Sequence, residues 1–364
     1  MGRTQVGGGL FAVLLIAAAA GACSGDSDDA SANADPTETT TAPTDEVVVD
    51  DCSPARSAVA GTQRLTFDHD GTTREYDLSV PDSYDGTAPS PLIVDLHGFS
   101  SNAAQEAVLT DMPEVAGERG YVVVTPQALE VDVPLTTGTI NATFWNIDPA
   151  AVRPGFEPPD DIGFLDALVD QLEEDLCIDT GREYVTGISN GAGMTMALIC
   201  GTESRFAAAA PVAGVNLVGD CEPGEPTPLI AFHGDADPLI PYDGGQAVGQ
   251  DYQVAVVQDR VASLAELAGC APEPTVEEPF DDIVTRTWAD CPEGLDFELV
   301  TVAEGGHTWP GTSIDIAAVD EATEGGEAVF GGFDYASIAG HQTDNIEATE
   351  LILDFFAAHE TAPA

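Results

Sequence analysis

The sequence predicts an α/β fold in which helices cover both faces of a mainly parallel sheet. Two observations support this prediction. Short apolar runs alternate with helix-compatible stretches from residue 52 onward, and four of these runs lead into glycine-containing loops that carry serine, aspartate or histidine. Alternation of strand and helix is typical of parallel sheets, because each crossover returns the chain to the same end of the sheet. With 43% hydrophobic residues in 364, the chain can build a core of this kind.

Eight strands are expected in this fold, and the first two are expected to be antiparallel. They lie at residues 64–67, 75–80, 92–96, 121–125, 183–186, 207–212, 229–232 and 297–302. Helical spacing of apolar residues predicts a helix over 162–176. The last helix is expected to begin at Thr343 as its N-cap and to bury Leu351, Ile352, Phe355 and Phe356. The acidic, glycine-rich segment 312–332 fits no element, and we expect a surface insertion there rather than a flap.

The first 22 residues have the pattern of an export signal. Arg3 supplies the positive end, residues 10–20 are apolar, and small residues precede Cys23. The apolar run is too short to span a bilayer comfortably. Cysteine after small residues resembles the lipobox of bacterial lipoproteins, which implies that Cys23 is lipidated; the alternative is an ordinary secretory signal with a nearby cysteine. Residues 23–50 have little to bury and are expected to be a disordered tether, followed by a folded domain over 51–364.

Six cysteines remain after Cys23, and an even number in an exported chain predicts three disulfides. Fifteen pairings can be drawn from the sequence alone. Short separations favour Cys200 with Cys221 and Cys270 with Cys291, which leaves Cys52 with Cys177. The alternative is a set of free buried thiols. Metal binding is not expected, because no two cysteines have C-x-x-C spacing and none lies near a histidine cluster.

Charge excludes two classes of partner. The chain has 64 acidic and 10 basic residues, all arginine, and a net charge of −54. Such a surface repels nucleic acid and anionic lipid headgroups, so the only membrane contact we expect is the N-terminal anchor. The acidity reflects either adaptation to salt or the composition of the source genome, and neither explanation bears on the chemistry of a site.

A candidate nucleophile lies in the pentapeptide Gly-Ile-Ser-Asn-Gly at 187–191, between a strand-like run and a helix-like run. In this context G-x-S-x-G forms a sharp turn that lifts the serine above the sheet, and the glycines leave room for it. A serine hydroxyl also needs a histidine to take its proton and an acid to orient that histidine. The later loops provide His307 and an acid, either Asp235 or Asp237. Serine, acid and histidine in this order are typical of the α/β-hydrolase fold.

Four motifs in register resemble the polyhydroxybutyrate depolymerase and feruloyl esterase family of α/β-hydrolases, over residues 52–359. They are Leu-His-Gly-Phe-Ser-Ser-Asn at 96–102, Thr-Gly-Ile-Ser-Asn-Gly at 186–191, Phe-His-Gly-Asp-Ala-Asp-Pro at 232–238 and Gly-Gly-His-Thr-Trp-Pro-Gly at 305–311. The resemblance implies that Ser189, Asp237 and His307 form the triad. It implies an oxyanion hole made by the amides of Asn190 and Phe99, and no cofactor. His97 and His233 each precede a glycine, and we expect them to shape loops rather than to replace His307. The alanine at 192 departs from the two glycines common in the family.

The function implied is that of an exported serine esterase, anchored to the membrane as a lipoprotein or else secreted. Its substrates would be small or oligomeric esters, such as hydroxyalkanoate oligomers or feruloyl and acetyl esters. Trp145 and Trp309 are candidates for the substrate pocket, although tryptophans are often simply core residues. Two alternatives stay open: a tethered protein of the same fold that binds an envelope ligand without turnover, and a serine peptidase of this fold.

Overall fold

The computed structural model describes residues 52–136, 138–147, 158–201, 204–219, 221, 224–249, 253–312 and 338–361. These residues belong to one compact unit that begins at residue 49. The predicted export signal, the tether with Cys23 and the segment 313–332 lie outside the described residues.

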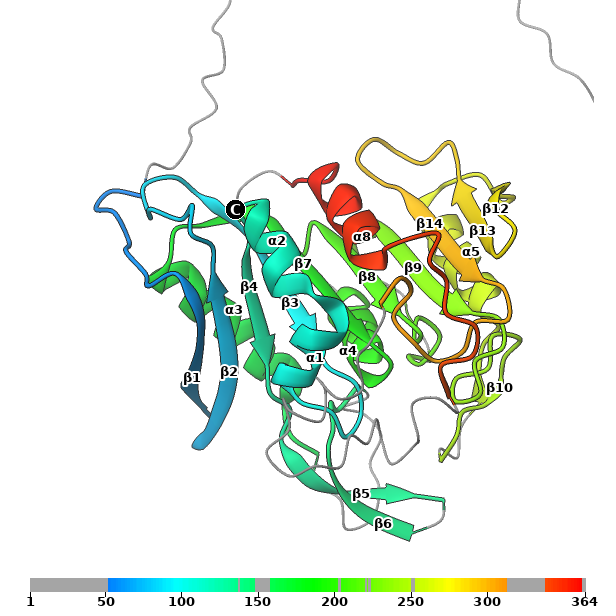
Figure 1. Ribbon diagram of the computed structural model, residues 1–364, viewed down its shortest axis with the longest axis horizontal. Coiled ribbons are helices and arrows are strands. Elements are labelled where there is room, and N and C mark those ends of the chain that lie inside the picture. The colour runs from blue at the N-terminus through cyan, green and yellow to red at the C-terminus, as the bar shows by residue number, and fades with distance from the viewer. Residues whose placement is uncertain are drawn as a thin grey trace, which may run out of the picture. The chain divides into compact units, whose positions relative to one another are not determined.

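Within the described residues, ten strands form one sheet in the order β1-β2-β4-β3-β7-β8-β9-β14-β13-β12 (Figure 1). Their bounds are β1 Gly61–His69, β2 Thr72–Val80, β3 Ser90–Leu96, β4 Val122–Pro126, β7 Ile178–Ile188, β8 Ala208–Val212, β9 Leu229–Gly234, β12 Thr275–Phe280, β13 Ile283–Trp288 and β14 Phe297–Val302. The six strands from β4 to β14 are parallel, and the strands outside them are antiparallel. The predicted α/β-hydrolase fold is confirmed, as are its eight strands and the antiparallel first pair.

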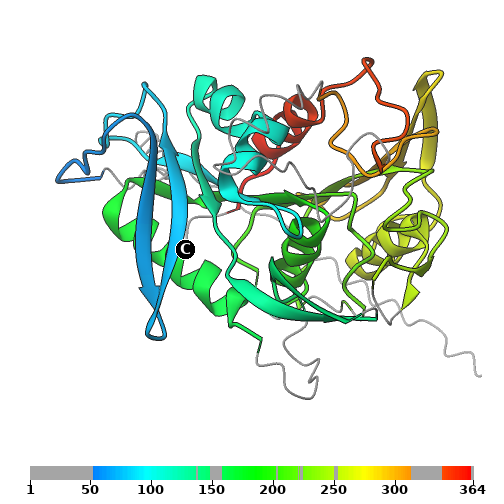
Figure 2. The same cartoon turned by 60° about the horizontal axis from the view of Figure 1, so that its bottom comes forward.

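Helices cover both faces of this sheet, and Figure 2 shows α3, α4 and α5 on one side and α1, α2 and α8 on the other. The bounds are α1 Ala103–Thr110, α2 Met112–Glu118, α3 Asp161–Asp175, α4 Asn190–Ile199, α5 Val257–Ala268 and α8 Ala348–Ala357. Two apolar clusters fill the layers between helices and sheet. The strand β4 contributes to both clusters and is buried along its whole length, as expected for a parallel strand covered on both faces. No helix in the described part of the chain is both long and apolar enough to span a membrane.

The last helix begins later than the sequence predicts. The residue before α8 is Glu347, whereas Thr343 accepts a hydrogen bond from the Asn345 amide at 3.1 Å and so caps a turn. The predicted Thr343 N-cap is therefore wrong, because an isolated turn can use the same side-chain bond as a helix start. Ile352, Phe355 and Phe356 are buried as predicted, and Leu351 is partly buried.

Two small hairpins lie outside the main sheet. One pairs β5 Glu130–Leu135 with β6 Gly138–Thr143, and the other pairs β10 Gly245–Gln246 with β11 Gln253–Val254. The β5–β6 hairpin is bound to the loop after β3, because the Ser100 amide donates to the Thr143 carbonyl at 2.9 Å. The Thr143 hydroxyl in turn donates to the Ser101 carbonyl at 2.6 Å.

Three disulfides join Cys52 to Cys177, Cys200 to Cys221 and Cys270 to Cys291. This pairing is the one that short sequence separations favour. The first bridge ties the start of the folded region to the beginning of β7, across 125 residues of chain. The other two each close a short loop on the α4 and α5 face of the sheet.

Candidate active site at the carboxyl edge of the sheet

The strands β3, β7, β9 and β14 run parallel, so the loops that follow them emerge at one edge of the sheet. These four loops carry the four sequence motifs. Ligands of open α/β sheets generally bind at this edge, outside the carboxyl ends of the strands.

Ser189 occupies a strained turn between β7 and α4. Its backbone has φ 57° and ψ −118°, which a non-glycine residue adopts rarely and at a cost. The flanking glycines are required by close contact with β3: a Cβ built at Gly187 would lie 2.4 Å from the Leu96 carbonyl oxygen, and one at Gly191 would lie 1.9 Å from it. The local geometry is therefore that of a nucleophile elbow.

The loop after β3 lies directly beside this elbow. A Cβ built at Gly98 would be 3.5 Å from the Cβ of Ser189. His97 holds the loop through both ring nitrogens: Nε2 accepts from the Ala128 amide at 3.1 Å, so Nδ1 carries the proton and donates to the Gly98 carbonyl at 2.7 Å. Burial lowers the pKa of His97 to about 4, and the ring is therefore neutral at pH 7.

The amides of Phe99 and Asn190 are available at this site. The Phe99 N–H belongs to the same planar peptide as the Gly98 carbonyl, so it points away from His97, and no hydrogen bond within the described residues uses it. Asn190 is the first residue of α4, and its amide has no partner inside the helix. Its side chain is engaged elsewhere, since Oδ1 accepts from the Trp145 amide at 2.7 Å and Nδ2 donates to the Trp145 carbonyl at 3.0 Å.

Asp237 and His307 are in direct contact. The His307 Nδ1 lies 2.7 Å from Asp237 Oδ2, and both residues are about 7% exposed. The other carboxylate oxygen, Oδ1, accepts from the amides of Leu239 at 2.8 Å and Ile240 at 2.9 Å. Burial alone would raise the pKa of Asp237, but the charge of His307 and hydrogen bonds from His233 and His307 hold it well below its usual range. The ionised carboxylate only accepts hydrogen bonds, so Nδ1 of His307 is protonated and Nε2 is left as the basic nitrogen.

Asp235, the other candidate acid, faces a different partner. Its Oδ1 accepts from the Glu304 amide at 2.6 Å, and its own amide donates to the Val302 carbonyl at 3.0 Å. Asp235 thus ties the end of β9 to the turn after β14, while Asp237 meets the imidazole.

His233 is a second histidine near Asp237, although the sequence predicted for it only a role in shaping its loop. Its Nε2 lies 2.9 Å from the Ile240 carbonyl and 3.4 Å from Asp237 Oδ2. The side chain is fully buried. The spacing of four between the two residues, at the end of a strand, is the only signal in the sequence for this contact.

The loop that carries His307 is held by a segment far along the chain. The amide of His307 donates to the Ile338 carbonyl at 2.6 Å, and the amide of Gly306 donates to Ala339 at 2.9 Å. A Cβ at Gly306 would lie 2.1 Å from the Ile338 carbonyl oxygen, so only glycine allows this approach. Residues 338–341 therefore set the position of the imidazole.

Both candidate pocket tryptophans are core residues in this structure. Trp145 is 0% and Trp309 is 2% exposed. The Trp145 indole donates to the His97 carbonyl at 3.0 Å, and the Trp309 indole donates to the Thr349 hydroxyl at 3.0 Å. Their observed role is in packing, and contact with substrate stays a prediction.

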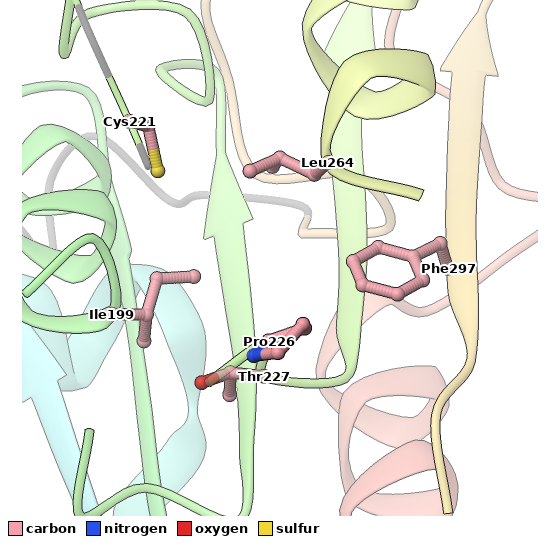
Figure 3. A pocket seen from close by; sticks show the side chains of 6 residues that line it. All are labelled: Ile199, Cys221, Pro226, Thr227, Leu264 and Phe297. Carbon is pink, nitrogen blue, oxygen red and sulfur yellow. The ribbon is translucent and has the colours of Figure 1, made fainter. Parts of the chain in front are cut away.

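A small apolar cavity lies away from these loops, between α4 and α5. It is lined by Ile199, Cys221, Pro226, Thr227, Leu264 and Phe297 (Figure 3). Its volume is about 10 Å³, which is on the order of one water molecule. It cannot hold an ester and belongs to the core around the second disulfide.

The chain matches no protein-family model, but it is similar to several curated esterases. It is 29% identical over 185 residues to feruloyl esterase C of Emericella nidulans, covering 49% of this chain and 60% of that protein. It is 29% identical over 260 residues to the putative esterase NocK of Nocardia uniformis, covering 66% of this chain and 72% of that protein. Feruloyl esterase B of Piromyces equi is 26% identical over 64% of this chain and 42% of its own length. The chain thus spans about three fifths of feruloyl esterase C.

Solved structures that match this chain include an acetyl xylan esterase from Aspergillus awamori. It has 15% identity and a TM-score of 0.47, and the match covers 72% of this chain and 98% of that one. A putative dienelactone hydrolase from Klebsiella pneumoniae has 16% identity and a TM-score of 0.45, and the match covers 81% of this chain and 98% of that one. These overlaps are too loose to bear on activity. The chain is thus similar in sequence to curated feruloyl esterases over about half of its length, and its four motifs lie at one edge of an α/β-hydrolase sheet.

Proposed function

We propose that the protein is a serine esterase that hydrolyses carboxylic esters through an acyl-enzyme. The contact between Asp237 and His307, at the same edge of the sheet as the strained Ser189 turn, is the observation that carries this proposal. The curated relatives named as esterases support it.

In the proposed mechanism, the Ser189 hydroxyl attacks the ester carbonyl while Nε2 of His307 takes its proton. Asp237 keeps the imidazole in the required tautomer and stabilises the cation that forms. The amides of Asn190 and Phe99 would bind the oxyanion; losing one such donor typically costs about 10²–10³ in rate. His307 then returns the proton to the leaving alcohol, and water repeats the sequence on the acyl-enzyme.

Feruloyl esters are the first substrates to test, because the relatives that resemble this chain are named for them. Acetyl esters and hydroxyalkanoate oligomers are the other members of the proposed class. Ser189→Ala should abolish turnover of methyl ferulate and of p-nitrophenyl acyl esters while the far-ultraviolet circular dichroism stays unchanged. Turnover above about a tenth of the wild-type rate would contradict the assignment of the nucleophile.

Two alternatives have distinct outcomes in the same assays. A protein of this fold that binds an envelope ligand without turnover would hydrolyse none of the esters. A serine peptidase would cleave peptide substrates in preference to esters, and this too would be lost in Ser189→Ala.

We also propose that the chain is exported and anchored through a lipid on Cys23, with residues 23–50 as its tether and residues 51–364 as the catalytic domain. The three disulfides support export, because such bonds persist in oxidising compartments. In the native host, Cys23→Ala should move the protein from the detergent phase to the aqueous phase. Unchanged partition would remove the anchor from the proposal.

A further inference from the structure

Two buried carboxyl groups that the proposed mechanism does not use lie behind its loops. Asp95 is on β3 and Glu106 is on α1, which packs against β3 (Figure 1). Both residues are 0% exposed. In the described part of the chain, no basic side chain is among the groups that act on either carboxyl, although a cation usually accompanies a buried carboxylate.

Hydrogen bonds satisfy only part of the pair. The Thr110 hydroxyl lies 3.0 Å from Asp95 Oδ2. Asp95 Oδ1 and both oxygens of Glu106 have no hydrogen-bond partner in the described part of the chain. Buried acceptors without donors are costly. A proton on Glu106 would neutralise this carboxyl and remove the cost of a second buried charge beside Asp95.

Glu106 lies close to the two loops that carry the catalytic groups. The backbone amides of Gly98 and Ile188 both act on its carboxyl and favour its charged form, although neither meets hydrogen-bond geometry. Gly98 immediately precedes Phe99, and Ile188 immediately precedes Ser189. The carboxyl therefore lies near the His97–Gly98 peptide, which precedes the peptide with the proposed Phe99 donor, and near the Gly187–Ile188 peptide, which precedes the nucleophile.

The surroundings favour the protonated state of the pair. Burial, followed by the charge of Asp95, raises the pKa of Glu106 well above its usual range. Burial also raises the pKa of Asp95 to about 7. The other titratable side chain at this end of β3 is His97, which is buried and neutral and so offers no positive charge.

We propose that Glu106 is a positioning residue for ester hydrolysis, which keeps a proton beside the buried Asp95 carboxyl and lies against the Gly98 and Ile188 peptides. This inference rests on the proposed function for its effect on turnover. When the proton leaves to solvent at alkaline pH, two adjacent negative charges remain in a dry site. Their repulsion would displace the loop after β3, which carries Phe99, and the turn at Ser189, although neither carboxyl touches substrate.

The test compares Glu106→Gln, Glu106→Ala and Asp95→Asn with the wild type and with Glu114→Gln, an exposed acid on α2, as the control. The amide of Glu106→Gln imitates the protonated acid, so this variant should keep kcat near pH 6 and lack the alkaline decline of kcat that the wild type shows. Glu106→Ala should lose about tenfold in kcat with little change in KM, because small misplacements of catalytic groups have effects of this size or larger. Glu114→Gln should follow the wild type.

Stability gives a second readout that does not need turnover. The folded pair holds protons that the unfolded chain has already released, so Tm of the wild type should fall as pH rises from about 5 toward 8. That fall should be smaller in Glu106→Gln and in Asp95→Asn than in Glu114→Gln. Hydrogen exchange of peptides covering 97–100 and 187–190 should be faster in Glu106→Ala.

Parallel pH profiles of kcat and Tm in wild type and Glu106→Gln would overturn the inference, as would unchanged kcat and exchange in Glu106→Ala. If Glu106→Gln does not fold, Asp95→Asn decides, because its amide removes the same repulsion. If the wild type hydrolyses no ester, the proposed function fails, while the Tm slope and the exchange rates still decide whether the pair keeps a proton and supports the loops.

Discussion

Asp237 uses its two carboxylate oxygens for different purposes. Oδ1 is held by two backbone amides of its own loop, which leaves Oδ2 for His307. Residue types and spacing alone leave Asp235 and Asp237 as equal candidates, because both follow the same strand and differ by two positions. The structure separates them, since the Asp235 carboxylate is engaged by the Glu304 amide.

This separation predicts different effects of the same substitution at the two positions. Asp237→Asn should cut kcat by about 10⁴, because an asparagine stabilises the wrong histidine tautomer. Asp235→Asn should lose far less, since its carbonyl oxygen can still accept from Glu304. Steady-state kinetics on one p-nitrophenyl ester measures both. If Asp235→Asn lost most of its kcat while Asp237→Asn stayed nearly normal, the acid of the triad would be Asp235 and not Asp237.

Some residues of the site could be predicted from the sequence, and others could not. Ser189 and His307 could be proposed as catalytic residues from the sequence, because each lies in a short motif with its own glycines. Glu106 could not be singled out, since nothing local distinguishes it from a surface acid on a helix. Asp95 gave a signal that could have been used: it interrupts an otherwise apolar strand, Leu92, Ile93, Val94 and Leu96, and a buried charge in such a place calls for a partner.

Among the elements, the turn from β7 to α4 depends most on glycine. A Cβ at Gly191 would fall 1.9 Å from the Leu96 carbonyl oxygen and 2.8 Å from that of His97. These are backbone atoms of β3 and its loop, which cannot move without shifting the sheet. Gly191→Ala should therefore lower Tm and reduce kcat by at least about 10²-fold, because it displaces both the turn at Ser189 and the loop after β3.

The matched control is Gly117→Ala on α2, where a Cβ would meet nothing within 4 Å. Alanine is the better helix former by up to about 1 kcal/mol, so this variant should be as stable as the wild type or more so. Thermal unfolding and kcat of the two variants give the comparison. A Gly191→Ala protein that matches Gly117→Ala in both would contradict the close packing of elbow and sheet.

The elements with a regular apolar pattern could be predicted from the sequence, and those without one could not. The central strands β4, β8 and β9 are mostly apolar runs, and α3 repeats its apolar residues at helical spacing. By contrast, every residue of β12 is exposed, so it shows no alternation of buried and exposed positions to read. The β5–β6 hairpin was missed for a related reason, because most of β6 is exposed too.

For the molecule as a whole, the order of strands was not readable, because it depends on crossovers between segments far apart in the chain. The same holds for the support of the His307 loop by residues 338–341. The disulfide pairing could be predicted in part from the sequence, because two bridges close short loops of 21 residues. The third follows once these are assigned.

The disulfide between Cys200 and Cys221 should contribute to stability through the unfolded chain. A loop of this length is worth about 3 kcal/mol in the loop-entropy description. The double variant Cys200→Ser with Cys221→Ser should lose roughly that much free energy of unfolding in urea, while its kcat stays near the wild-type value because the bridge lies on the α4 and α5 face. Equal stability of variant and wild type would show that the bridge leaves the unfolded state unconstrained.

The central claim is that Ser189 forms the acyl-enzyme, and covalent labelling tests it most directly. The wild type would be treated with a fluorophosphonate, digested and mapped by mass spectrometry, with residual ester hydrolysis measured in parallel. We predict one label per chain, on the peptide that contains Ser189, with activity lost in proportion and no label on Ser189→Ala. Label on a different residue, or full ester turnover by a protein that takes no label, would contradict the account.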